Sequence, residues 1–202
     1  MTEQKIETET AQGSAGKNGR RRFFGVGAAT APFLLTLVSQ PALGVTCFTP
    51  SRSLSKNTSI TQASRIGNCS GAKSAINYLQ LTNGPWPASV PHTTLFHPLF
   101  RQGTTDNKTK FVKTVNTQVV SKTMGEVIAI NSNGEVHRHL LAAYLNKKGG
   151  GGASIPNIVL TETAILTIWS EYAQNGFYAP FATVKWYDAE IINYLKSNGI
   201  VS

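Results

Sequence analysis

Carboxylates are scarce in this sequence, which has 10 Asp and Glu residues against 19 Lys and Arg residues. A glycosidase of the usual kind needs two carboxyl groups in defined roles. Three of the acidic residues, Glu162, Asp188 and Glu190, fall where helices are expected to begin, and a negative charge is stabilising there. The sequence therefore gives poor support to a glycosidase with paired carboxylates.

Motifs for other common chemistries are also missing. The chain has no Gly-x-Ser-x-Gly elbow and no dinucleotide-binding fingerprint. Residues 71–74 have only a faint likeness to a phosphate loop, because the preceding glycine spacing is wrong. Residues 67–71 have the outline Gly-x-Cys-x-Gly, but residues 62–66 before them make a poor buried strand. We therefore expect no cofactor.

Long hydrophobic runs are absent as well. The apolar stretch 25–38 is diluted by small residues and interrupted by Pro32, whereas a membrane span needs about 20 apolar residues. It follows a polar head, residues 1–19, and the sequence Arg20-Arg21-Arg22-Phe23-Phe24. This matches the twin-arginine pattern of two arginines, any residue, Phe and a bulky apolar residue. The combination predicts a cleavable export signal.

Small residues at Ala42 and Gly44 suit cleavage after residue 44. We therefore predict a twin-arginine signal peptide over 1–44 and one exported domain over 45–202, located in the periplasm, at the cell surface or outside the cell. The twin-arginine translocase is the partner expected during export. A lipoprotein modified at Cys47 and an uncleaved amphipathic anchor remain as alternatives.

The two cysteines, Cys47 and Cys69, both fall early in the predicted mature part. An exported protein meets an oxidising compartment, where an even number of cysteines favours a disulfide. Closing a loop of this length stabilises a fold by roughly 3 kcal/mol. The enclosed segment is rich in Ser and Thr, so burial alone would hold it weakly.

The pattern along the chain predicts a mainly α fold, a small single domain of about four to five helices. An irregular, disulfide-tethered segment (45–70) precedes them, and a proline-rich loop (84–104) carries Trp86, Phe96 and Phe100 as anchors to the core. The glycines at 149–152 are interpreted as a flexible connection. A strand remains an alternative for residues 111–120 because of their β-branched content. Helical patterns cover 124–130, 135–147, 161–175 and 188–198, and weaker ones cover 73–81 and 111–120.

The histidines are the main candidates for chemistry. His137 and His139 lie two apart on the clearest predicted helix, so they point in different directions and cannot share one metal ion. His139, beside the apolar Leu140, is interpreted as a structural histidine. His97 and His139 would form a site only if the fold brought them together. Trp86 is a further binding candidate, and no metal site is predicted.

Several stretches resemble a group of small exported proteobacterial proteins that carry a twin-arginine signal. The matching stretches are Val45-Thr46-Cys47, Asn68-Cys69-Ser70, Trp86-Pro87, Thr94 to His97, Arg138 to Asn146, Leu160-Thr161-Glu162, Trp169 and Ile191 to Lys196. That family usually carries Gly-Tyr-Trp-Lys-x-His before the Trp-Pro pair. Residues 76–81 stand there in this chain, without the tryptophan or the histidine. The resemblance implies export and a shared fold, and it implies no particular activity.

The formal net charge of +9 makes an anionic surface polymer a candidate partner, although the lysines are mostly scattered. No nucleic acid is expected. The leading hypothesis is a non-enzymatic exported protein that acts by binding or by assembly with other envelope proteins. The alternative is a small exported hydrolase or metal-binding protein that uses His97 and His139.

Overall fold

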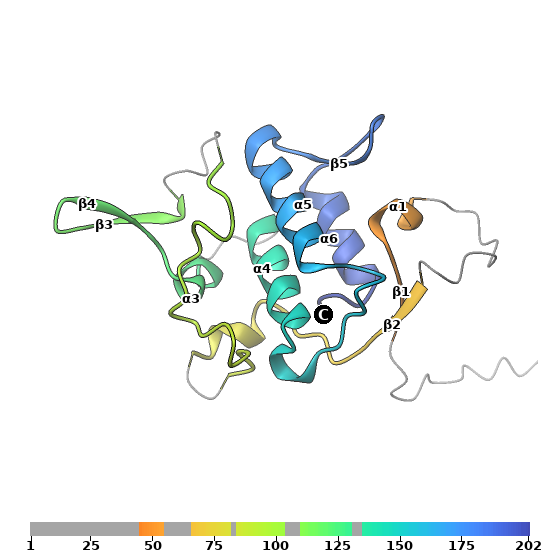
Figure 1. Ribbon diagram of the computed structural model, residues 1–202, viewed down its shortest axis with the longest axis horizontal. Coiled ribbons are helices and arrows are strands. Elements are labelled where there is room, and N and C mark those ends of the chain that lie inside the picture. The colour runs from red at the N-terminus through yellow and green to blue at the C-terminus, as the bar shows by residue number, and fades with distance from the viewer. Residues whose placement is uncertain (1–44, 55–65, 82–83, 104–109, 131–134) are drawn as a thin grey trace, which may run out of the picture. The chain divides into compact units, whose positions relative to one another are not determined.

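A computed structural model describes residues 45–54, 66–81, 84–103, 110–130 and 135–202 (Figure 1). All of them belong to one compact unit of the chain. The predicted export signal over 1–44, with Arg20, Arg21 and Phe23, lies outside the described residues. Within the described ranges, no helix combines the length and the hydropathy that crossing a bilayer requires.

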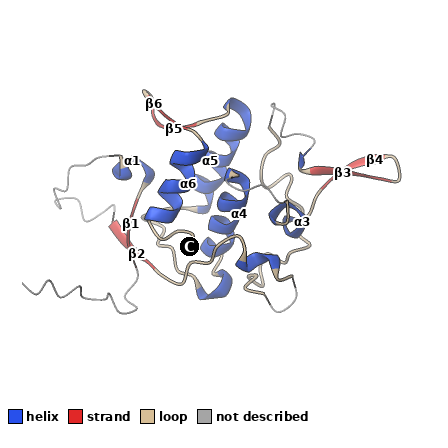
Figure 2. Cartoon of the chain, turned by 180° about the vertical axis from the view of Figure 1, so that it is seen from behind, coloured by secondary structure: helices blue, strands red, loops and turns tan. Residues whose placement is uncertain are grey.

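The centre of the fold is α4, which covers Val136–Lys147. It packs against α3 (Met124–Ile128), α5 (Glu162–Asn175) and α6 (Asp188–Ser197). Both ribbon views place α4 between α3 on one side and the pair α5 and α6 on the other (Figures 1 and 2). Every residue over 140–146 is buried, because neighbouring helices cover α4 on more than one side.

The helix ends follow their capping residues. The Thr161 hydroxyl accepts a hydrogen bond from the Ala164 amide at 3.0 Å, and α5 ends at Gly176, whose φ of 77° is left-handed. At the start of α3, Thr123 and Glu126 cap each other's backbone amides, at 3.2 and 2.8 Å. The helices expected over 124–130, 135–147, 161–175 and 188–198 are therefore confirmed, with small shifts at their ends.

Strands form three two-stranded antiparallel sheets among the described residues. The strand pairs are β1 (Val45–Phe48) with β2 (Ile66–Cys69), β3 (Val112–Val115) with β4 (Gln118–Ser121), and β5 (Tyr178–Phe181) with β6 (Val184–Trp186). The short helical elements are α1 (Pro50–Ser53), η2 (Asn77–Leu79) and η3 (Gly150–Gly152).

The prediction of a mainly α fold is wrong, because the described residues hold six strands beside five α-helices. The helix expected over 111–120 is the hairpin β3–β4. Its turn residues, Asn116 and Thr117, have left-handed φ values of 48° and 69°, as two-residue hairpin turns require. The hairpin β5–β6 was not predicted, and the helix expected over 73–81 is only the 3₁₀ turn η2.

Covalent and polar ties hold the irregular N-terminal segment. The Cys47–Cys69 disulfide joins β1 to β2, so the predicted cross-link is confirmed. The Asn198 side chain, just after α6, accepts a hydrogen bond from the Phe48 amide at 2.8 Å. The hydroxyl of Tyr194 donates to the Phe48 carbonyl at 3.0 Å. These contacts attach β1 to the C-terminal helix.

A second polar tie is buried beneath the segment 71–81. Asn146 in α4 has no exposed surface and makes four hydrogen bonds. Its amide oxygen accepts from the Lys73 amide (3.0 Å) and the Tyr78 hydroxyl (2.7 Å). Its nitrogen donates to the carbonyls of Lys73 and Ile200, both at 2.8 Å. One side chain thus links the helix core to two distant stretches of irregular chain.

Aromatic rings fix the proline-rich loop, as expected. The rings of Phe96 and Phe100 are stacked at 4.6 Å and fully buried. Phe96 also meets Phe111 and Trp169 edge-on or tilted, at 5.1 and 5.4 Å. Such ring pairs add to the free energy of burial. This cluster forms the wall behind the candidate site.

Candidate functional site

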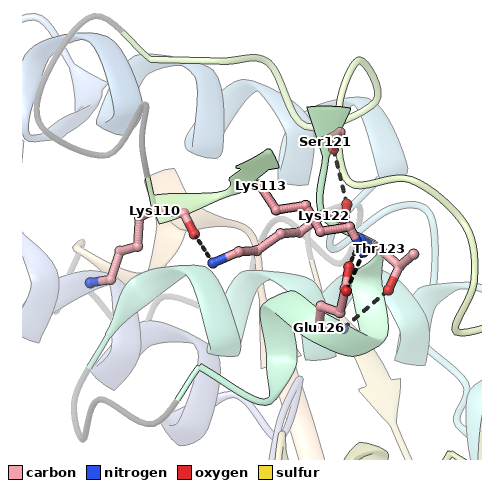
Figure 3. A network of polar contacts seen from close by, with 6 residues as sticks. All are labelled: Lys110, Lys113, Ser121, Lys122, Thr123 and Glu126. Atoms are coloured by element: carbon pink, nitrogen blue, oxygen red, sulfur yellow. Dashed lines mark hydrogen bonds and ion pairs between the residues drawn. The ribbon is translucent and has the colours of Figure 1, made fainter. Parts of the chain in front are cut away.

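The base of the β3–β4 hairpin is fixed by a network of polar contacts (Figure 3). The Lys122 ammonium donates to the carbonyl of Lys110 at 2.7 Å, and the Lys122 amide donates to the carbonyl of Phe111 at 2.9 Å. Ser121 donates to the Lys122 carbonyl at 2.9 Å, while Lys113 forms an ion pair with Glu126. The Lys110 side chain points away from this network, so its ammonium group is available to α4.

Lys110 begins a chain of three polar side chains at the start of α4. Its ammonium forms an ion pair with Oε1 of Glu135, and Oε2 of Glu135 lies 2.7 Å from Nδ1 of His137. A carboxylate only accepts hydrogen bonds, so Nδ1 carries the proton. The other ring nitrogen, Nε2, is buried and has no hydrogen-bond partner among the described residues.

Burial controls the protonation of His137, whose side chain is only 3% exposed. Burial lowers the pKa of His137 to about 4, since the charged ring would lose its hydration. The carboxylate of Glu135 opposes this shift, whereas the positive charges of Lys110 and Arg138 add to it. At neutral pH the ring is therefore uncharged, and Nε2 is a hydrogen-bond acceptor.

A second polar pair comes from α5 and α6. The hydroxyl of Tyr172 donates to Oδ1 of Asp188, the first residue of α6, at 2.7 Å. Burial first, then the hydrogen bond to Asp188 and the charges of Asp188 and Glu135, raise the pKa of Tyr172. The negative charges of both carboxylates therefore act on the Tyr172 hydroxyl.

These two groups share one cavity of about 190 Å³. Its apolar lining is Phe111, Val136 and Trp169, and its polar lining is Lys110, Glu135, His137, Tyr172 and Asp188. The lining side chains differ in how far they are buried. Asp188 is exposed at the mouth, Lys110, Glu135 and Tyr172 are partly exposed, and His137 is almost fully covered.

The three residues singled out from the sequence lie elsewhere. His97 contacts the carbonyl of Phe100 through Nδ1 and lies 6.3 Å from the ring of Phe111. Trp86 donates to the carbonyl of Tyr78 at 3.0 Å, in the segment that Asn146 secures. No hydrogen bond, ion pair or ring contact among the described residues joins His97, His139 and Trp86.

His139 faces a different neighbourhood from His137. Burial, together with the positive charges of Lys196 in α6 and of Arg138, lowers the pKa of His139 to about 4. Its Nδ1 atom is buried without a hydrogen-bond partner in the described part of the chain. There, no group of three or more His, Cys, Asp and Glu side chains is arranged to hold a metal ion.

The sequence alone did not single out His137, Glu135, Tyr172 or Asp188 as site residues; His137 was considered with the other histidines, and Asp188 was explained as a helix-start residue. The only local signal was the Glu-x-His spacing at the start of a predicted helix, which places a carboxylate beside Nδ1. Comparisons with protein-family models, with curated proteins and with solved structures find no match.

Proposed function

We propose that the chain is exported by the twin-arginine route and acts outside the cytoplasm by binding a small polar molecule in this cavity. The Cys47–Cys69 disulfide supports the export half of the proposal. Disulfides persist in oxidising compartments and are rare in the cytosol. The Arg20-Arg21-x-Phe23-Phe24 sequence and the resemblance to small exported proteins support the same route.

The cavity favours binding over hydrolysis. A hydrolytic base must reach a nucleophile or a water molecule, and Nε2 of His137 is buried. Among the described residues that line the cavity, none carries a Ser, Thr or Cys nucleophile. The polar groups are instead held in fixed pairs, Glu135 with His137 and Tyr172 with Asp188, which suits recognition by preorganised hydrogen bonds.

The export half of the proposal is tested by replacing Arg20 and Arg21 with Lys together. We expect this double variant to stay in the cytoplasm with Cys47 and Cys69 as reduced thiols, measured by fractionation and by thiol alkylation with mass spectrometry. Arg22→Lys is the matched control, because Arg22 occupies the unconstrained position of the pattern, and it should be exported normally. Normal export of the double variant would overturn the proposed route.

A further inference from the structure

Two cationic side chains on neighbouring helices have no counter-ion. Arg138 lies in the first turn of α4 and Lys196 in the last turn of α6. Among the described residues, neither side chain takes part in a hydrogen bond or an ion pair. Other cations of the chain differ in this respect. Lys110, Lys113 and Lys148 pair with carboxylates, and Lys122 and Lys147 donate to backbone carbonyls.

The charges of Arg138 and Lys196 act on the same ring, that of His139. His139 follows Arg138 in α4, and α6 packs against α4. The positive charges of Lys196 and Arg138 both disfavour a proton on this ring, and no carboxylate in the described part of the chain opposes them. Positive groups that are gathered in this way without a counter-ion attract an anion.

The atoms that remain open around His139 can all donate hydrogen bonds. Nε of Arg138 and Nδ1 of His139 are buried, so the inner part of each side chain is covered. The two terminal amino groups of Arg138 and Nε2 of His139 are not covered in this way, and Lys196 is exposed. The uncharged ring of His139 can carry its proton on Nε2, from which it donates outward. Side chains whose inner parts are held in place lose less conformational entropy when their tips bind a ligand.

We propose that Arg138, His139 and Lys196 bind a small divalent oxyanion, phosphate or sulfate, either free or carried on a small molecule. The planar guanidinium of Arg138 offers two parallel N–H donors to two oxygens of such a group. Nε2 of His139 donates to a further oxygen, and the exposed ammonium of Lys196 adds a positive charge. The inference does not depend on the cavity that His137 lines, because residues two apart on a helix point to different sides.

The experiment titrates the purified, oxidised protein near pH 7 with sulfate, phosphate, methyl phosphate and acetate, with the ionic strength held constant by sodium chloride. Binding is followed by calorimetry and by the nitrogen resonances of the His139 ring and the Arg138 guanidinium. We expect saturable binding of sulfate and phosphate that moves both sets of resonances. Acetate, with one negative charge, should bind about tenfold more weakly. Methyl phosphate tests the ester form, and tighter binding of it than of phosphate would identify a phosphate carried on a small molecule as the ligand.

Three variants locate the site. Arg138→Gln and Lys196→Gln should each weaken sulfate binding, the first by about tenfold because it removes a charged pair of donors. Lys185→Gln is the matched control, since it removes one positive charge from an exposed lysine whose ammonium lies 4.3 Å from the centre of the Phe177 ring, and it should leave binding unchanged. Equal weakening by all three variants would show that sulfate responds only to the net charge and would overturn the site, as would the absence of saturable binding.

The two buried histidines of α4 provide a further check within the same protein. A bound anion favours the imidazolium ion, so saturating sulfate should raise the pKa of His139. His137, which already has the Glu135 carboxylate at Nδ1, should respond much less. An equal rise of the pKa at both rings would indicate a general salt effect and contradict the proposal.

Discussion

Asn146 offers the sharpest test of how this fold is held together. Its side chain is fully buried and makes four hydrogen bonds, to Lys73 (twice), Tyr78 and Ile200. Replacing it with alanine leaves the buried Tyr78 hydroxyl and the backbone groups without partners. At about 1 kcal/mol for each hydrogen bond, we expect Asn146→Ala to lower the free energy of unfolding by about 4 kcal/mol. That is a large share of the roughly 5–15 kcal/mol that stabilise a typical domain.

The assay is urea unfolding of the oxidised protein, followed by tryptophan fluorescence and by far-ultraviolet circular dichroism. Asn77→Ala is the matched control, since Asn77 is exposed and its oxygen accepts from Ser74 at 2.8 Å. Water replaces that oxygen, so the control should lose less than about 1 kcal/mol. If Asn146→Ala lowers the free energy of unfolding no more than Asn77→Ala does, the buried amide does not hold the segment 71–81 in place.

Two further predictions concern pH and the β3–β4 turn. The pKa of His137 is lowered from 6.5 to about 4, so the unfolded chain takes up this proton at a higher pH than the folded chain does. The free energy of unfolding therefore falls as the pH drops from about 6.5 to about 4, by at most about 3 kcal/mol. Because His139 has a similarly lowered pKa, His137→Gln should make this fall less steep without removing it, in urea unfolding at pH 7.5, 5.5 and 4.5. An equally steep fall in the variant would contradict the assignment. Thr117 is β-branched with φ of 69°, so Thr117→Gly should raise the free energy of unfolding by about 1 kcal/mol. Thr114→Gly, on strand β3, is the control and should lower it; a loss of stability in Thr117→Gly would show that the turn is not strained.

The helices that were predicted correctly from the sequence have clear start and stop residues next to them in the chain. Thr161 and Gly176 bound α5 because a hydroxyl caps the first turn and a glycine accepts the left-handed φ at the end. The disulfide was equally easy to predict, because a chain with two cysteines can form only one intramolecular pairing. In each case the interaction that fixes the structure either joins residues close together in the sequence or has no alternative partner.

The β3–β4 hairpin was missed for a physical reason. Spacing of four residues between valines indicates a helix only if those valines share a buried stripe. Val119 is 70% exposed and Val115 is 45% exposed, so neither marks a core. The β-branched content was the better signal, because it favours a strand whether or not the side chains are buried.

The candidate site was harder to predict because its parts are far apart in the sequence. Lys110 precedes β3, His137 lies in the first turn of α4, Tyr172 lies in the last turn of α5, and Asp188 is the first residue of α6. Residue type alone favoured His97 and His139 as much as His137. What separates them is the tertiary surroundings: His137 has a carboxylate at Nδ1, whereas the charges that act on His139 are positive.

The protonation of His137 is set by burial and by opposing charges around its ring. The positive end of α4, Lys110 and Arg138 all disfavour the imidazolium ion, and burial disfavours it most. Glu135 favours it but also shares its charge with Lys110. The uncharged ring therefore prevails at neutral pH. Protonation near pH 4 would put a buried positive charge beside Lys110 and Arg138, so acid destabilises the folded state at the start of α4.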